Sequence, residues 1–174
     1  MTRVSLIDSS NTTADRAALL TQIHNAFGAT PNMFKAVANS PAALKSMWGA
    51  FGALGGGVIP AKLGEQIAVA VADRNACEYC LAAHTALGRK AGASAEEMSA
   101  AQGGQATDPK TAAALRFALQ LVEARGQVSQ ADVQAVRAAG FNDEAIVEIL
   151  AHVALNLFTN YVNCLLYTSP SPRD

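Results

Sequence analysis

The chain is poor in charge, in aromatic side chains and in cysteine. Charged residues make up 16% of its 174 residues and aromatic residues 6%, and three cysteines occur. So few cysteines exclude a disulfide-dense secreted scaffold. The net charge of −1 and the lack of any basic run predict no nucleic-acid partner and no membrane partner. Long apolar runs are also missing, because the longest dense one covers residues 67–72, and we expect no membrane-spanning segment.

The first residues also lack the features of a secretory signal. Residues 1–8 contain neither an apolar core nor a cleavage site, so the sequence predicts a cytoplasmic location. In that compartment, cysteines a few residues apart are more often catalytic or metal-binding than parts of structural disulfides. An apolar fraction of 51% over this length is enough for one domain with a substantial core.

The last residues differ in composition from everything before them. Residues 164–174 read CLLYTSPSPRD and directly follow an apolar helical stretch, residues 146–163. The string resembles, codon by codon, the translation of a transposon-based sequencing-library adapter. A natural C-terminus is the alternative. We interpret residues 164–174 as a non-native tail, so that a single domain covers residues 1–163 and Cys164 is not a native thiol.

Helix signals dominate the remaining chain and strand signals are nearly absent, so the sequence predicts an all-α fold. Proline, glycine and capping residues mark where helices begin and end. Six helices are expected at residues 13–27, 41 to 55–57, 60–75, 77–92, 94–103 and 108–126. Another short helix is expected to begin at Pro31, and the last two helices begin at the N-caps Ser129 and Asn142. Ser94 and Glu97 are expected to form a capping box at the start of the helix 94–103.

The final helix is apolar nearly all round between residues 145 and 162. A helix on the surface of a monomer would show a polar face. We therefore expect this helix to be central in the fold or covered by another subunit, which predicts a homo-oligomer.

One group of residues can carry chemistry: Cys77, Cys80 and His84. Positions i, i+3 and i+7 share one face of a helix, so the three side chains point the same way. Cys80 and His84 are one turn apart, within reach of a hydrogen bond or one bridging water. Cys77 lies near the start of its helix, where the dipole favours a thiolate. This reasoning from the residues alone favours Cys77 as the reactive thiol.

Glu65 precedes the buried run 67–72 and borders the expected core. A carboxylate in such a place needs a partner, and His84 is the obvious one, because a carboxylate fixes the tautomer of an imidazole. His152 is expected to be a satisfied core histidine, with lining of the site as the alternative. Tyr79 lines the pocket or simply packs.

The Cys77–Cys80 pair leaves three interpretations open. The pair carries redox chemistry, or it belongs to a zinc site with His84 and a fourth ligand such as Glu65 or His152, or it packs inertly. A structural zinc site usually brings a second ligand pair, which this sequence lacks.

The pattern Glu65, eleven residues, Cys77-x-x-Cys80, three residues, His84 resembles the core motif of the AhpD-like family. These proteins are alkylhydroperoxidases of the carboxymuconolactone decarboxylase superfamily. Residues 29–34 and 151–160 also resemble family segments. The similarity spans most of residues 28–163, with the core motif at 65–84.

The resemblance implies an all-helical fold assembled as trimers or hexamers. It also implies a thiol-dependent peroxidase that reduces alkyl hydroperoxides without a metal or organic cofactor. Cys80 would be the peroxidatic thiol and Cys77 the resolving thiol, with Glu65 and His84 as the proton relay. An external dithiol or a thiol-disulfide protein would be the reductant.

One position departs from the archetype of the family. Alkylhydroperoxidase D carries histidine just before the second cysteine, where this chain has Tyr79. The departure puts the dihydrolipoamide-linked reductant of the archetype in doubt. Two alternatives to the peroxidase remain: a lactone enzyme like carboxymuconolactone decarboxylase, and a zinc-bound or redox-sensing assembly module.

Overall fold

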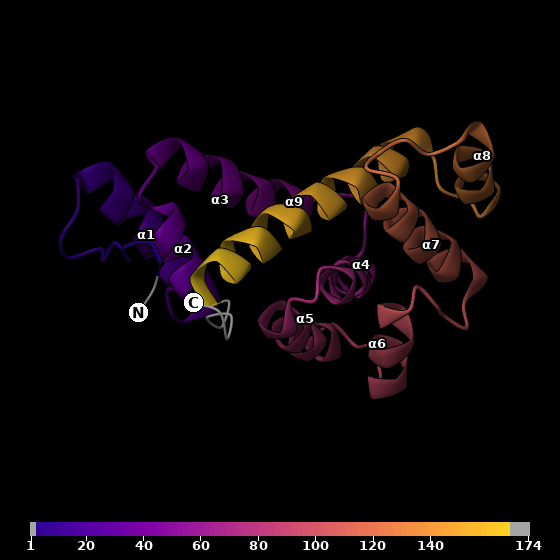
Figure 1. Cartoon of the computed structure of the whole chain (residues 1–174), viewed down its shortest axis with the longest axis horizontal. Coiled ribbons are helices and arrows are strands. Elements are labelled where there is room, and N and C mark those ends of the chain that lie inside the picture. The colour runs from indigo at the N-terminus through magenta and orange to yellow at the C-terminus, as the bar shows by residue number, and fades with distance from the viewer. Residues whose placement is uncertain (1–2, 168–174) are drawn as a thin grey trace, which may run out of the picture. The chain divides into compact units, whose positions relative to one another are not determined.

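The computed structural model describes residues 3–167, and these form helices without any strand (Figure 1). The all-α fold predicted from the sequence is confirmed. The elements in chain order are α1 (Ala14–Phe27), α2 (Asn32–Val37), α3 (Pro41–Gly55), α4 (Ala61–Arg74), α5 (Glu78–Lys90), α6 (Ala95–Gln102), α7 (Pro109–Glu123), α8 (Gln130–Ala138) and α9 (Asp143–Tyr167).

The capping residues identified in the sequence begin the helices as expected. Ser94 and Glu97 form a capping box at α6, and the Asp108 side chain accepts a hydrogen bond from the Thr111 N–H at α7. Asn142 accepts one from the Ala145 N–H at α9. These side chains satisfy N–H groups that have no partner inside the helix.

The internal contacts of the chain form two compact units. Unit 1 combines residues up to Ala53 with those from Tyr161, and unit 2 is Leu54–Asn160. The single domain over residues 1–163 stays a prediction, because this division does not test it. All the residues of the predicted site belong to unit 2.

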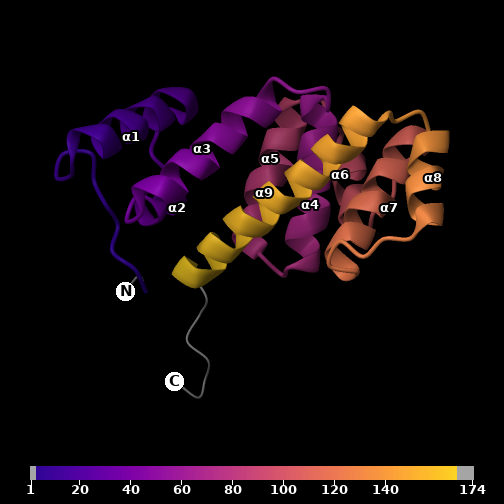
Figure 2. The same ribbon diagram turned by 90° about the horizontal axis from the view of Figure 1, so that it is seen from above.

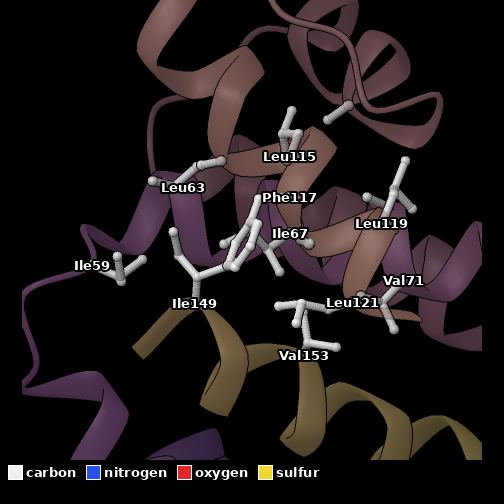
Figure 3. Packing of buried hydrophobic residues seen from close by; sticks show 14 of the residues in the cluster. Ile59, Leu63, Ile67, Val71, Leu115, Phe117, Leu119, Leu121, Ile149 and Val153 are labelled. Carbon is white, nitrogen blue, oxygen red and sulfur yellow. The ribbon is translucent and has the colours of Figure 1, made fainter. Parts of the chain in front are cut away.

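Unit 2 is built around α4. Residues 67–72 of this helix are each at most 2% exposed, which explains why they form the densest apolar run in the sequence. Ile67 and Val71 of α4, Phe117 of α7, and Ile149 and Val153 of α9 belong to one hydrophobic cluster (Figure 3). α5 and α6 also pack against α4, and α8 lies beside α7 (Figure 2). The buried run of α4 gives the site a rigid base.

Unit 1 has an aromatic cluster of its own. Phe27, Phe34, Trp48 and Phe51 lie with their ring centroids 5.5–6.2 Å apart. Such tilted and edge-to-face pairs add to the stabilisation that burial provides.

α9 corrects one expectation from the sequence. Residues 143–166 form a helical stretch of 24 residues with a mean hydropathy of 1.4, so length and composition alone would let it cross a membrane. The expectation that no apolar stretch approaches this length was wrong, because scattered polar residues interrupt the run without lowering its average hydropathy much. A core helix meets the same criterion, and α9 gives Ile149 and Val153 to the core of unit 2.

α9 is apolar on its exposed face as well. This face includes Val147, Leu150 and Phe158, which are 62%, 46% and 36% exposed.

At its C-terminal end α9 continues to Tyr167. Residues 168–174 of the expected non-native tail lie outside the described residues.

Candidate active site

The turn between α4 and α5 places the cysteines at a helix start. Ala76 has a φ of 51°, in the left-handed region, and the Cys77 N–H bonds to the Ala72 carbonyl at 2.9 Å. The Asn75 amide donates to the Oδ1 atom of buried Asn160 at 3.0 Å and ties the turn to α9. Cys77 is therefore the N-cap residue of α5, and the prediction that it lies near a helix start is confirmed.

Cys77 and Cys80 form a disulfide in the structure. Their Cα atoms are 5.3 Å apart, and the two residues are 4% and 2% exposed. The predicted shared face of these two side chains is confirmed. A disulfide between neighbours on one helical turn can exchange two electrons with little backbone movement, because the thiols already face each other.

Glu65 and His84 form the hydrogen bond that the sequence suggested. The Glu65 Oε2 atom lies 2.8 Å from the His84 Nδ1 atom, and the two side chains are 25% and 17% exposed. A carboxylate only accepts hydrogen bonds, so Nδ1 is assigned as the N–H that donates. The Nε2 atom of His84 is then the nitrogen available for proton transfer.

Gly88 makes room for Met98 of α6 beside this contact, and sequence reasoning missed it. A Cβ atom at Gly88 would lie 2.5 Å from the Met98 sulfur, whereas the Cβ of Glu65, at 3.4 Å, would be at ordinary van der Waals distance. The absence of a side chain therefore lets Met98 pack against α5 next to Glu65. The available signal was a glycine inside a helix, one turn after His84.

His152 projects from α9 against α4. A Cβ atom at Gly64 would lie 3.2 Å from the His152 Cε1 atom, so the ring sits directly on the backbone before Glu65. Its Nε2 atom is buried and has no hydrogen-bond partner among residues 3–167. Burial lowers the pKa of His152 from its ordinary value, while the charges of Glu148 and Glu65 act in the opposite direction. The expectation of a satisfied core histidine was wrong, because the ring packs against Gly64 and no described group bonds to its Nε2 atom.

The structure also bears on the position of Tyr79 and on the zinc interpretation of the cysteine pair. Tyr79 is 54% exposed, so it is not a packed core residue. Among residues 3–167, no three histidine, cysteine or acidic side chains gather as a metal site. Cys77 and Cys80 are joined in a disulfide, and the His84 Nδ1 atom is hydrogen-bonded to Glu65. In this structure the four residues are therefore not arranged as zinc ligands.

Sequence and structure comparisons define the class of protein. The model of the carboxymuconolactone decarboxylase family matches residues 41–124. An uncharacterized peroxidase-related protein with an alkylhydroperoxidase AhpD core, from Ralstonia eutropha JMP134, is 25% identical with a TM-score of 0.83, over 99% of this chain and 93% of its own. A peroxidase-related protein from Silicibacter sp. TM1040 is 25% identical with a TM-score of 0.76, over 94% and 86%. These similarities support the assignment of the chain as an AhpD-like member of the carboxymuconolactone decarboxylase superfamily.

A further neighbour shares the fold alone. A variant of the debrominase Bmp8, in complex with 2,3,4-tribromopyrrole, is 20% identical with a TM-score of 0.79, over 99% of this chain and 95% of its own. No curated protein sequence matches the chain.

The lowered pKa of His152 predicts a specific loss of stability in acid. Below pH 6.5 the unfolded chain protonates this histidine while the folded protein keeps it neutral, so the free energy of unfolding falls with pH. The slope is at most about 1.4 kcal/mol per pH unit. We expect His152→Gln to lose less stability than the wild type between about pH 7.5 and 5, by urea unfolding. The exposed His24→Gln should keep the wild-type slope, and an equally steep His152→Gln profile would contradict the prediction.

Proposed function

We propose that the protein is a thiol-dependent peroxidase that reduces alkyl hydroperoxides with Cys77 and Cys80. The observation that carries this proposal is the buried cysteine pair on α5, already joined as a disulfide, beside the Glu65–His84 hydrogen bond. Redox-active pairs combine two thiols within bonding distance and a group that moves protons. Superfamily membership and the peroxidase-related neighbours support the same reaction class.

The reaction starts from the reduced pair. The Cys80 thiolate attacks the terminal oxygen of the hydroperoxide, the O–O bond breaks, and Cys80 becomes a sulfenic acid. The leaving alkoxide takes a proton and departs as an alcohol. The Cys77 thiol then attacks the sulfenic sulfur, which releases water and forms the disulfide. An external dithiol or thiol-disulfide protein supplies two electrons and two protons to restore both thiols.

Glu65 and His84 are the proposed proton relay. His84 lies one turn after Cys80, and its Nδ1–H is held by Glu65, so its Nε2 atom can accept the thiol proton and later return it to the alkoxide. Glu65 acts through His84 and is a positioning residue: its negative charge stabilises the imidazolium that forms between the two transfers. Such a relay acts without a metal or an organic cofactor.

Replacing each cysteine in turn with serine separates their proposed roles. We expect Cys80→Ser to abolish hydroperoxide reduction, and Cys77→Ser to allow one attack and then hold Cys80 as a sulfenic or overoxidised acid. Intact mass of the reduced protein after one equivalent of cumene hydroperoxide reports both outcomes: loss of two hydrogens in the wild type, and gain of oxygen in Cys77→Ser. Undiminished turnover in either variant would contradict the roles.

Further measurements test the alternative functions and remove the third thiol. Protein ending at Asn163 removes the thiol of Cys164 from the analysis. Conversion of a carboxymuconolactone by the double Cys77→Ser, Cys80→Ser variant would favour the lactone enzyme. Bromide release from 2,3,4-tribromopyrrole by the reduced wild type, at a higher rate than peroxide reduction, would move the substrate class toward halogenated aromatics.

Loss of the Glu65 charge tests the relay. Glu65→Gln keeps the size of the side chain but cannot stabilise the imidazolium, so we expect kcat/KM to fall by about 10²-fold, at the lower end of the range for general acid–base catalysis. Stopped-flow oxidation of the reduced protein measures the effect. The exposed Glu144→Gln on α9 is the matched control and should react at the wild-type rate. Equal rates in the two variants would exclude the relay.

We also propose that further copies of this chain cover the exposed apolar face of α9. Val147, Leu150 and Phe158 recur at helical spacing on this face. The family resemblance favours trimers or hexamers. Light scattering after size exclusion should give a multiple of the 18.0 kDa chain, and Leu150→Glu should reduce it. A monomeric wild type would contradict this proposal. The cytoplasmic location stays a prediction.

A further inference from the structure

Asn160 on α9 is a buried polar residue that the proposed reaction does not use. Its side chain is 0% exposed, and its Oδ1 atom accepts the hydrogen bond from the Asn75 amide at 3.0 Å. Its Nδ2 group has no hydrogen-bond partner among residues 3–167. A completely buried amide without an acceptor is unfavourable, so its presence calls for a physical explanation.

The asparagine one turn earlier on α9 shows how such an amide is ordinarily satisfied. Asn156 is also buried, and its Nδ2 group donates to the His152 carbonyl of the same helix at 2.9 Å. The corresponding carbonyl for Asn160 is that of Asn156, which instead accepts from the Thr159 hydroxyl at 3.1 Å. The hydrogen bond to Asn75 therefore holds the Asn160 amide in an orientation that leaves Nδ2 without an acceptor.

The contact with Asn75 brings this amide to the turn that carries the cysteine pair. Asn75 is the C-cap residue of α4, and Cys77 follows it by two residues. The Cys77 N–H bonds back to the Ala72 carbonyl at 2.9 Å, so Cys77 stays beside the end of α4 where Asn160 is bound. Cys77 and Cys80 are 4% and 2% exposed, so the amide and the pair are both enclosed in the interior of unit 2.

The oxidation state of the pair explains the missing acceptor. In this structure Cys77 and Cys80 form a disulfide, whose uncharged sulfur atoms are weak acceptors. Reduction breaks the S–S bond with two electrons and two protons, and loss of one proton then leaves a thiol and a thiolate, which is a charged and therefore strong acceptor. Cys77 also begins α5 without a side-chain cap, so a thiolate there lies at the positive end of the helix dipole.

We propose that the Asn160 Nδ2 group donates a hydrogen bond to the thiolate of the reduced cysteine pair. The bond forms only after reduction, so Asn160 stabilises the reduced thiolate over the disulfide. It increases the fraction of thiolate and makes the pair easier to reduce. This inference deepens the proposed function and rests on it in one respect: the reduced pair is the form that attacks the hydroperoxide.

The titratable and charged groups closest to the pair along the chain and on the helices packed around it remain unchanged in the variants that test this proposal. These groups are Asp73, Arg74, Glu78, Glu65, His84 and His152. Each of them titrates in the wild type as well, so a difference between two proteins at one pH reports the substituted amide.

Equilibration of the full chain with dithiothreitol tests the proposal in the wild type and in Asn160→Leu, with thiol alkylation and intact mass as the readout. At about pH 9 the pair carries a thiolate, and we expect the equilibrium constant for reduction to be at least about 10-fold lower in Asn160→Leu. For a two-electron couple this is about 30 mV. At about pH 5 both thiols hold their protons, and the two proteins should agree.

Asn156→Leu is the matched control. It removes a buried amide from the same helix, but the Nδ2 hydrogen bond of Asn156 lies within α9, so this variant should keep the wild-type equilibrium at both pH values. A structural role of Asn160 does not depend on the thiol proton. An effect of equal size at about pH 5 and about pH 9, or no effect at either, would therefore overturn the proposal.

NMR of the wild type gives a second test that needs no variant. Reduction at about pH 8 should shift the side-chain amide signals of Asn160 and leave those of Asn156 nearly unchanged; unchanged Asn160 signals would overturn the proposal. Neither measurement uses a hydroperoxide. A pair that fails to reduce hydroperoxides therefore contradicts the proposed function alone, and loss of both effects in an active peroxidase contradicts the role of Asn160 alone.

Discussion

The close packing of α5 on α4 is the constraint on which the site depends. Glu65 and His84 meet at 2.8 Å across these two helices, and Gly88 leaves room beside them for Met98 of α6. The turn at Ala76 reverses the chain so that Cys77 caps α5 and Cys80 lies inside its first turn. Two adjacent helices therefore hold the thiols and the relay without a contribution from a flexible loop.

The buried run of α4 makes this arrangement rigid. Residues 67–72 have almost no exposed surface and pack among α5, α6 and α7, with α9 completing the cluster. Because α4 is fixed on all sides, the positions of Glu65 and Gln66 on it are fixed as well. The two neighbours in sequence face different environments: Glu65 contacts α5, and Gln66 faces a cavity among α6, α7 and α9. One helix thus separates the proposed redox site from the cavity.

His152 illustrates why local reasoning about single residues failed at this site. A histidine in an apolar helix was expected to have a hydrogen-bond partner, yet its Nε2 atom is enclosed without one, against Gly64. Sequence pattern indicated burial correctly, since burial follows from helix periodicity. The pattern could not indicate the hydrogen-bond partner, because the partner depends on which segment lies opposite the ring. Here Gly64 brings the backbone of α4 close to the His152 ring. Gly88 was missed for the same reason.

The sequence by itself determined the helices, their caps and the candidate residues. Ser94, Asp108 and Asn142 begin helices through hydrogen bonds to residues three positions away, and Cys77 and Cys80 share a face through helical spacing. Only the tertiary structure decided what lies across each helix: Glu65 against His84, His152 against Gly64, and Gln66 against a cavity. Local hydrogen bonds depend on neighbours along the chain, whereas these contacts depend on how closely distant helices pack.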